Sequence, residues 1–234
     1  ATYFGEKTLK ECLTNIYSQN YPKDKIEVII VDGGSKDKTL EIAKKFPVKI
    51  ILNPKKWNDG VGMGKSQGGR IAKGDFIAFV DQDNLILGKN WIKEMLKPFY
   101  KDEKVSIIGS KLAVIKQDNL VNQYLSLIGT DPFASYMSLE GQLELNEKEF
   151  EKKGDFLIYD LAKKKPLCAG SNGYIYKKEY YDKIGGYTRD NENIVRLAKL
   201  KTKMYISLKA RLHHKTVANF LGLLKKRWFW GRFY

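Results

Sequence analysis

Short apolar runs, separated by turns and by stretches with a helical period, constrain the fold of this chain most strongly. The run IEVIIV at 26–31 is continuous and rich in β-branched residues, which is typical of a strand covered on both faces. It is followed by the turn DGGS, by a helical stretch through Phe46 and by a second strand at 48–52. This order predicts a βαβ unit, and therefore an α/β protein with a mixed, mostly parallel sheet flanked by helices.

The other predicted elements continue this alternation along most of the chain. Helices are predicted at 6–19, 65–72, 91–100 and 120–128, and strands at 76–80, 105–115 and 204–212. Residues 140–160 are acidic and show no regular period, so we expect an irregular insertion there. The chain opens on a loop, ATYFGEK, where a doubly wound sheet usually has a strand, so we expect a first strand upstream of residue 1.

Chain length and cysteine content limit the class of protein. A chain of 234 residues is long enough for one large α/β domain or two small ones. Cys12 and Cys168, the two cysteines, form no CxxC pair, so we interpret them as reduced thiols of a cytoplasmic protein. No apolar run reaches the ~18–20 residues that a membrane-spanning helix requires.

The formal net charge of +15 is concentrated near the C-terminus, since residues 193–234 contain eleven Lys and Arg and no Asp or Glu. Within this region, NFLGLLKKRWFWGRFY at 219–234 combines cations with Leu, Phe and Trp, which suits an interfacial helix on an anionic membrane. We therefore predict that the basic aromatic segment 217–234 contacts the cytoplasmic face of a membrane. The alternatives are a solvated basic face and a helix that packs on the domain.

Acidic residues follow two of the predicted strands. Asp32 follows the strand at 26–31, and Asp81 and Asp83 follow the strand at 76–80. Ligands of parallel sheets bind beyond the carboxyl ends of the strands, so these acids are expected at one edge. Two carboxylates suit Mg²⁺ or Mn²⁺ that also binds substrate phosphates. The alternative is a polar turn in which an aspartate caps the backbone.

The glycine-rich loop GVGMGKSQGG at 60–69 resembles a P-loop but departs from it. The motif G-x-x-x-x-G-K-[ST] requires glycine at position 59, which is Asp59 here. We therefore reject the interpretation of this chain as a P-loop nucleoside triphosphatase. Lys65, beside the backbone amides of this loop, is still a candidate contact for a diphosphate.

Taken together, these motifs resemble the inverting family 2 glycosyltransferases, which have the GT-A fold. ATYFGE at 1–6 is similar to the family's P-T-Y-N-E-E, and VDGGSKDKT at 31–39 to V-D-D-G-S-x-D-x-T, with Gly33 as the main difference. GKSQG at 64–68 lies where the family has A-R-N-x-G, and AKGDFIAFVDQDN at 72–84 resembles the segment that leads into its metal motif.

The resemblance implies a donor site for a nucleotide-diphospho-sugar, in which the N-terminal motif and Asp32 hold the base and ribose. The donor residues predicted in this way are Thr2, Tyr3, Glu6, Asp32, Gly62, Lys65 and Asp81. The same resemblance implies that Asp83 ligates Mg²⁺ or Mn²⁺, with Asp81 nearby. His213 and His214 follow the strand at 204–212, and in the resembled fold a histidine here approaches the metal or the diphosphate. His213 is taken as the third candidate ligand, with His214 and a structural histidine as the alternatives.

Inverting transfer also requires a base that removes the proton of the acceptor hydroxyl. The family's pattern is E-D-x-D-L-x-x-R, and this chain has RDNENIVR at 189–196. The resemblance thus assigns the base to Asp190 and the second acid to Glu192, with Arg189 in place of the usual Glu. It assigns Asn172 and Gly173 to the acceptor side. An ordinary acidic helix start is the alternative for Asp190.

The predicted protein is therefore a metal-dependent inverting glycosyltransferase that acts on a glycan or lipid-linked acceptor. Residues 1–216 would form one catalytic domain, with a nucleotide-sugar half at 1–115 and an acceptor half at 116–216. The alternatives are a polyprenyl-phosphate sugar synthase and a non-catalytic nucleotide-sugar-binding module. A nucleic-acid partner is not expected, because acids at the ligand edge would repel a phosphate backbone.

Overall fold

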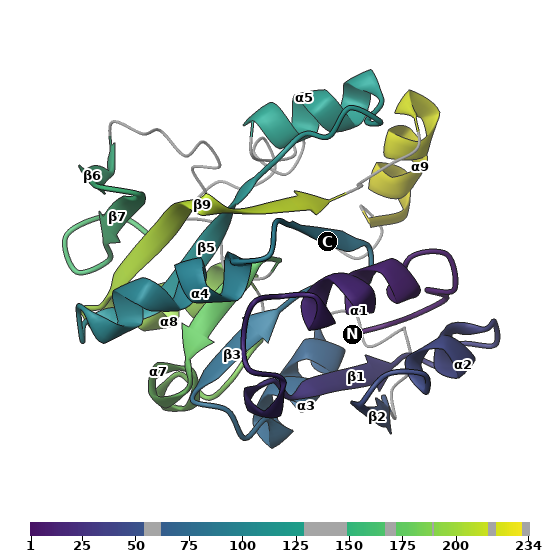
Figure 1. Cartoon of the computed structure of the whole chain (residues 1–234). Helices are drawn as coiled ribbons and strands as arrows, with labels where there is room; N and C mark the ends of the chain where they lie inside the picture. The colour runs from purple at the N-terminus through teal and green to yellow at the C-terminus, as the bar shows by residue number, and fades with distance from the viewer. Residues whose placement is uncertain (54–61, 129–148, 167–171, 189, 215–218, 231–234) are drawn as a thin grey trace.

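The computed structural model describes residues 1–53, 62–128, 149–166, 172–188, 190–214 and 219–230 (Figure 1). The helices in this part of the chain are α1 (Leu9–Tyr17), α2 (Thr39–Ala43), α3 (Met63–Ile71), α4 (Trp91–Leu96), α5 (Leu120–Ile128), α7 (Lys178–Lys183), α8 (Asp190–Lys199) and α9 (Phe220–Trp230), with short 3₁₀ turns at Lys23–Lys25 and Lys97–Tyr100. The strands are β1 (Val28–Asp32), β2 (Val48–Leu52), β3 (Phe76–Phe79), β4 (Asn84–Leu87), β5 (Val105–Leu112), β6 (Glu151–Lys153), β7 (Phe156–Asp160), β8 (Tyr174–Lys177) and β9 (Lys203–His214).

The strands form a parallel pair, β1–β2, and a seven-stranded sheet with the order β3-β8-β5-β9-β7-β6, in which β4 also pairs with β9. The predicted mixed α/β sheet is confirmed, but parallel pairing does not dominate the described strands. Only β1–β2 and β5–β9 are parallel, and the other described pairs are antiparallel. The difference arises because β8 enters between β3 and β5 in the opposite direction to both.

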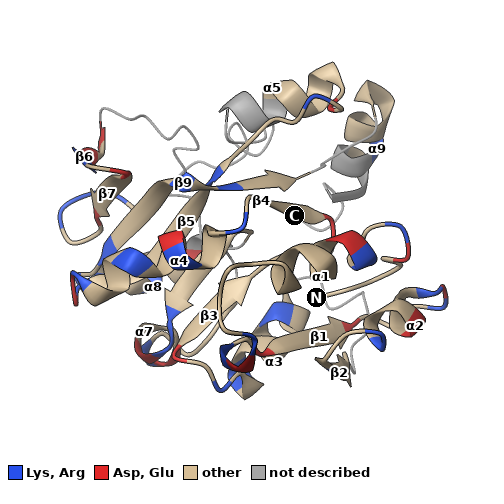
Figure 2. Cartoon of the chain, in the orientation of Figure 1, with Lys and Arg blue, Asp and Glu red and all other residues tan. Residues whose placement is uncertain are grey.

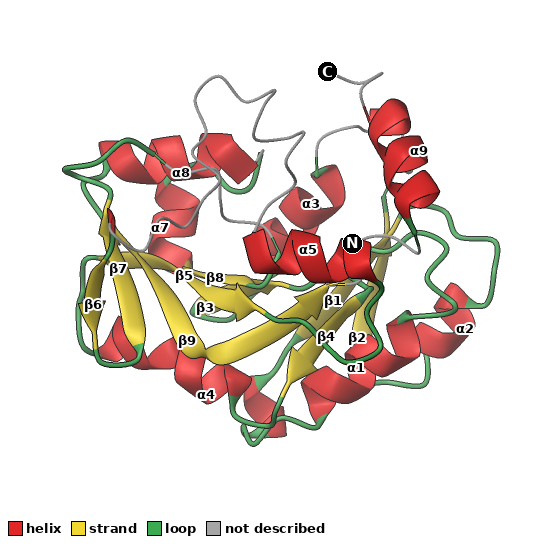
Figure 3. Cartoon of the chain, turned by 90° about the horizontal axis from the view of Figure 1, so that it is seen from above, coloured by secondary structure: helices red, strands yellow, loops and turns green. Residues whose placement is uncertain are grey.

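Both faces of the large sheet are covered by helices (Figure 3). Met204 and Ile206 of β9 pack in a cluster with side chains of α7 and α8, whereas Tyr205 and Leu212 pack with Trp91 and other residues of α4. Side chains of a strand alternate between faces, so a strand buried on both faces is apolar at nearly every position. This explains the apolar run MYI at 204–206 of β9, where consecutive side chains are buried on opposite faces.

Two elements differ from the sequence prediction. Residues 151–160 are not irregular, because β6 and β7 form an antiparallel hairpin around Gly154, whose φ is +58°. The tight turn needs this left-handed conformation, which glycine adopts without steric cost. The short strand β4 directly follows the acidic motif and was not predicted; it exists through its pairing with β9, more than a hundred residues away in the sequence.

The N-terminal residues run beside β1, since Thr2 forms a parallel bridge with Asp32. The upstream strand and the division into two functional halves stay predictions. None of the helices in the described ranges combines the length and apolar character that crossing a bilayer would take.

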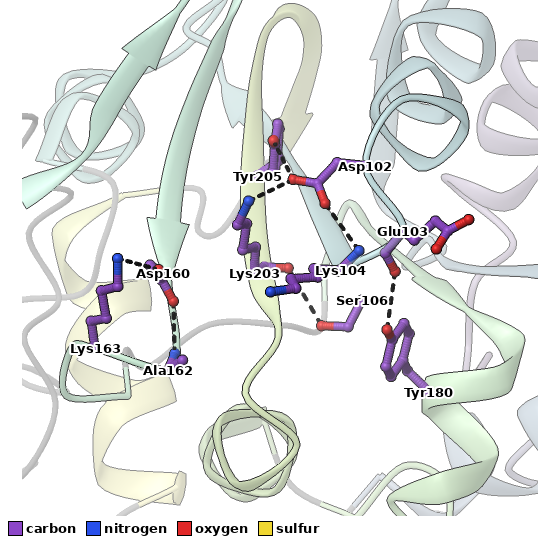
Figure 4. A network of polar contacts seen from close by, with 10 residues as sticks. All are labelled: Asp102, Glu103, Lys104, Ser106, Asp160, Ala162, Lys163, Tyr180, Lys203 and Tyr205. Atoms are coloured by element: carbon purple, nitrogen blue, oxygen red, sulfur yellow. Dashed lines mark hydrogen bonds and ion pairs between the residues drawn. The ribbon is translucent and has the colours of Figure 1, made fainter.

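A polar network joins the starts of β5 and β9 (Figure 4). The Asp102 carboxylate accepts hydrogen bonds from Lys203 Nζ at 2.8 Å, Tyr205 OH at 3.1 Å and the backbone N–H of Lys104 at 3.0 Å. Burial alone would raise the pKa of Asp102, but these hydrogen bonds outweigh it and the pKa is lowered. The hydrogen bond to the Asp102 carboxylate raises the pKa of Lys203.

Replacing Asp102 with asparagine should therefore destabilise the fold by about 1–2 kcal/mol at pH 7. A carboxyl with a lowered folded-state pKa stabilises the protein above its unfolded pKa of about 3.9, and this contribution is lost as the pH falls through the folded value. The difference between wild type and Asp102→Asn, measured by urea unfolding, should thus shrink below about pH 4. Asp24→Asn, at an exposed position outside the network, is the matched control; an equal effect of both would contradict the prediction.

Candidate active site

The ends of β1 and β3 are joined by the N-terminal loop. Thr2 donates its N–H to Val31 O at 2.9 Å and accepts from Gly33 N at 2.8 Å, which places it beside the end of β1. The next residue, Tyr3, is held by the side-chain amide of Gln82, which accepts from Tyr3 N and donates to Tyr3 O, both at 3.0 Å. The structure thus brings the predicted base-binding loop against the acidic motif that follows β3.

Asp32 is fully buried at the end of β1. Its carboxylate accepts hydrogen bonds from Thr2 Oγ1 at 3.2 Å, Ser35 Oγ at 2.6 Å, and the N–H groups of Gly34 and Ser35 at 2.8 Å each. A carboxylate can accept about four hydrogen bonds, so these four donors occupy all of its acceptor sites. Asp32 therefore organises the turn after β1, and its contact with a nucleobase stays a prediction.

The spacing of the motif at 31–39 is explained by its bonds to the N-terminal loop. Three side chains of the motif accept backbone N–H groups of the loop: Ser35 Oγ accepts from Phe4 at 3.0 Å, Asp37 Oδ2 from Glu6 at 3.2 Å and Thr39 Oγ1 from Gly5 at 2.7 Å. In return, Glu6 Oε2 accepts from Lys38 N at 3.2 Å. The predicted ligand Glu6 thus takes part in a loop–loop network, and the Tyr3 ring packs edge-on against Phe4.

The first turn of α3 brings Lys65 to the acidic motif. Lys65 Nζ lies 2.9 Å from Asp81 Oδ1 and 5.9 Å from the ring centroid of Tyr187. Gly62 caps α3 with φ +71°, and a Cβ at this position would lie 2.5 Å from Tyr187 Cε1. The glycine therefore allows the close approach of the Tyr187 ring. Burial alone would raise the pKa of Asp81, but positive groups led by Lys65 lower it, so the carboxyl is ionised at neutral pH.

The two histidines at the end of β9 point to different partners. His214 Nε2 lies 3.4 Å from Asp83 Oδ2, whereas His213 Nε2 lies 2.8 Å from Asp118 Oδ1 in a buried pair. Adjacent residues of a strand point to opposite faces, so only one of the two can face the acidic motif. The structure thus corrects the predicted position: the histidine next to Asp83 is His214, not His213.

The acidic motif offers two carboxylates toward a divalent cation. The described residues contain no group of three or more His, Cys, Asp and Glu side chains that could hold a metal ion. Asp81 and Asp83, with His214 beside Asp83, would therefore hold Mg²⁺ only together with substrate phosphates, as Mg²⁺ typically uses one or two carboxylates plus such phosphates. The Cys12 thiol lies next to the acidic motif and donates a hydrogen bond to the backbone oxygen of Asp81, with Sγ and O 3.5 Å apart. Burial, followed by the charges of Asp83 and Asp81, raises its pKa to about 12, so it stays protonated.

The residues predicted on the acceptor side lie next to this edge. Gly173 donates its N–H to Phe79 O at 2.8 Å and its carbonyl accepts from Ser110 N at 3.0 Å, so the turn connects the ends of β3 and β5. Its φ is +73°, and a Cβ would lie 2.5 Å from Ser110 Oγ, which explains the glycine. Asn172 Oδ1 is buried and makes no hydrogen bond. A contact of this unsatisfied acceptor with a substrate stays a prediction.

Asp190 is the first residue of α8, and its side chain and Arg189 lie outside the described part of the chain. Two residues further, Glu192 forms an ion pair with Arg196 at 2.5 Å. Arg196 also donates to Ile184 O at 2.9 Å, which anchors the helix to the end of α7. The structure therefore places Glu192 in an exposed intrahelical contact, and its role toward an acceptor stays a prediction.

A comparison with protein-family models decides the family. The model described as Glycosyl transferase family 2 matches residues 1–185. The chain belongs to glycosyl transferase family 2.

Several family 2 and related proteins are similar to this chain. Poly(ribitol-phosphate) beta-N-acetylglucosaminyltransferase TarS of Staphylococcus aureus is 35% identical over 88 residues, which are 36% of this chain and 15% of that protein. The chain thus matches only a small part of the length of this relative. The crystal structure of S. aureus TarS 1-349 in complex with UDP-GlcNAc superposes with a TM-score of 0.67 at 19% identity, over 94% of this chain and 58% of that one.

A mannosyltransferase from Pyrobaculum calidifontis in complex with GDP-Man and Mn²⁺ gives a TM-score of 0.63 at 17% identity, over 93% of this chain and 56% of that one. These structural neighbours have the GT-A fold, and the predicted fold class is confirmed.

Sequence reasoning missed one candidate of this family 2 domain and could not separate two others. Gln82 was not among the predicted site residues, yet its side-chain amide holds Tyr3 through two hydrogen bonds. The one sequence signal was that a glutamine side chain can donate and accept at once. The sequence could not choose between His213 and His214, because the face of each residue depends on the register between β4 and β9.

The last described helix, α9, makes few apolar contacts with the rest of the chain. Leu223 of α9 is buried against Val121 of α5. Several apolar side chains that the structure describes on these two helices are exposed: Leu120, Tyr124, Phe220, Leu221, Leu224 and Trp228. Neither helix carries an acidic residue (Figure 2). The described part of α9 therefore packs on α5 and also presents apolar side chains to solvent, and its contact with a membrane stays a prediction.

Proposed function

We propose that this domain transfers a sugar, with inversion, from a nucleotide-diphospho-sugar to a glycan or lipid-linked acceptor. The observation that carries the proposal is the convergence of the N-terminal loop, Lys65 and the motif Asp81–Asp83 at one edge of the sheet. This edge lies beyond the carboxyl ends of β1 and β3, where α/β proteins bind nucleotides. The UDP-GlcNAc and GDP-Man complexes of structurally similar proteins support this class of donor.

The donor would lie across the ends of β1 and β3. The Tyr3 ring and the turn organised by Asp32 would contact the base and ribose, and Lys65 would contact the diphosphate. A Mg²⁺ or Mn²⁺ held by Asp83, with Asp81 and His214 beside it, would offset the charge that develops on the leaving diphosphate. The Mn²⁺ in the structure of the mannosyltransferase complex supports this choice of ion.

The acceptor would approach from the side of α8 and the turn at Asn172. Inversion requires that the acceptor oxygen attacks the sugar carbon from the face opposite the diphosphate. Asp190 accepts the proton of the acceptor hydroxyl as the new bond forms, and Asn172 Oδ1 and Glu192 help to orient the acceptor. The name of the S. aureus relative specifies a poly(ribitol-phosphate) acceptor, which supports a cell-surface glycan as the acceptor class.

The domain would work at the cytoplasmic face of an anionic membrane. The exposed apolar and aromatic side chains on α5 and α9 support peripheral contact, as do the absence of acids from residues 193–234 and the cations Lys225, Lys226 and Arg227. Trp and Tyr favour the depth of lipid headgroups, and Lys and Arg are attracted to anionic lipids. Such contact would bring a lipid-linked or membrane-proximal acceptor to the site.

A donor screen tests the proposal directly. Thermal unfolding would be followed with UDP- and GDP-sugars, each with and without Mn²⁺, and donor hydrolysis would be measured in parallel. We expect a shift for one nucleotide that requires Mn²⁺, since a ligand that binds only the folded state stabilises it. Asp83→Asn should lose this shift, and Asp155→Asn, at an exposed position in the β6–β7 turn, should keep it. No shift with any nucleotide sugar would contradict the proposal.

A further inference from the structure

We propose that Lys65 is an internal counterion of Asp81 in the free protein, and that it exchanges this partner for the diphosphate when nucleotide and metal bind together. This inference rests on the proposed function and adds a rule for the order of binding. Its basis is the ion pair of 2.9 Å between Lys65 Nζ and Asp81 Oδ1, in which the two side chains are 14% and 30% exposed.

The packing of α3 directs Lys65 to this place. A Cβ on Gly64 would lie 2.9 Å from Ala1 Cβ, so this glycine lets α3 lie close to the N-terminal residues beside β1, and one on Gly68 would just contact Val31 Cγ2 at 3.4 Å. The side chain of Lys65 in the first turn then extends between Asp81 and the Tyr187 ring. The ring gives the ammonium a second favourable contact, because its face attracts cations. Lys65 can therefore leave Asp81 without becoming unpaired.

The charges at this edge make the exchange necessary. Lys65 places a positive charge 2.9 Å from the Asp81 carboxylate. A divalent cation that arrives alone must compete with Lys65 for the carboxylate and is repelled by the ammonium. A diphosphate reverses this balance, since it attracts the ammonium and the metal at the same time. The metal and the nucleotide should accordingly bind weakly alone and tightly together, as reciprocal coupling requires.

The experiment compares wild type and Lys65→Met with two probes. The first is Mn²⁺ alone, followed by the loss of its free electron-paramagnetic-resonance signal. The second is UDP or GDP, whichever the donor screen selects, titrated calorimetrically at saturating Mn²⁺. We expect Lys65→Met to bind Mn²⁺ alone about tenfold more tightly, and the nucleotide about tenfold more weakly, from the loss of one charge–charge contact in each case.

Two further variants serve as controls. Lys65→Arg keeps the charge and should keep weak binding of Mn²⁺ alone. Lys73→Met removes an exposed charge just after α3 and should change neither affinity. Circular dichroism and thermal unfolding would show that every variant is folded.

The opposite signs of the two effects make the result decisive. If Lys65→Met lowers the affinity for the nucleotide but does not raise the affinity for Mn²⁺ alone, Lys65 is only a diphosphate contact. The proposed exchange of partners by Lys65 is then wrong, whereas the proposed function stands. If wild type binds neither UDP nor GDP with Mn²⁺, the proposed function itself is overturned, and this inference with it.

Discussion

Replacing Asp190 with asparagine should lower the rate of sugar transfer by about 10²–10⁴-fold, the usual contribution of a general base, while donor binding stays nearly unchanged. Asparagine has a similar size but cannot accept the proton of the acceptor hydroxyl. The measurement is kcat at saturating donor and acceptor, with nucleotide affinity determined separately by calorimetry. A fall in kcat without a fall in affinity locates the defect in the chemical step.

The control for this prediction is Asp182→Asn on the neighbouring helix α7. Asp182 pairs with Lys178 at the surface, so its loss should affect stability only slightly and turnover far less than Asp190→Asn does. If Asp190 were merely an acid at a helix start, its replacement would cost about 0.3–1 kcal/mol of stability and leave turnover intact.

The same variant discriminates between the proposed acceptor and the alternatives. A phosphate acceptor is already ionised, so a polyprenyl-phosphate sugar synthase would need no base at this position. Retained turnover of Asp190→Asn with a polyprenyl phosphate would favour that enzyme over one with a hydroxyl acceptor. A wild-type domain that binds the donor with Mn²⁺ but transfers sugar to no acceptor would instead favour a non-catalytic binding module.

Replacing Asp32 with alanine should destabilise the fold by about 3–4 kcal/mol, because it leaves four donors around a buried site without their acceptor. Asp32→Asn should also destabilise it, since the new amide group would face the N–H groups of Gly34 and Ser35 or the hydroxyl donors. Urea unfolding at pH 7 would measure both effects. The turn after β1 holds the N-terminal loop, so nucleotide binding should weaken in parallel.

The less buried neighbour Asp37 provides the matched control for Asp32. Its carboxylate also accepts backbone hydrogen bonds, from Glu6 and Thr39, but water can replace it at this position. Asp37→Ala should therefore destabilise the fold much less than Asp32→Ala does. If Asp32→Ala were as stable as Asp37→Ala, the carboxylate of Asp32 would be a ligand-binding group without a structural role.

Local sequence patterns were sufficient for most individual elements. β2 was predicted with its observed bounds and β1 within two residues at each end, because each is a short apolar run between turn residues. α1 and α5 were predicted from their helical periods. Such elements are specified by the burial of their own side chains, and the fold class followed from their order.

Pairings between distant segments could not be predicted in the same way. The sequence NLIL becomes β4 only because β9 offers it a partner, and β8 runs antiparallel to its neighbours because it inserts between β3 and β5. These outcomes depend on contacts across a hundred residues. No local propensity encodes the direction or register of such contacts.

The sequence by itself determined the α/β class, the acids that follow two strands and the resemblance to family 2, since these depend on residue order and on short spacings. Only the tertiary structure decided that Gln82 fixes Tyr3, that Lys65 neutralises Asp81 and that His214 rather than His213 lies beside Asp83. The reason is geometric: a side chain's partner is set by strand register and helix placement, and a shift of one residue turns it to the opposite face of the sheet.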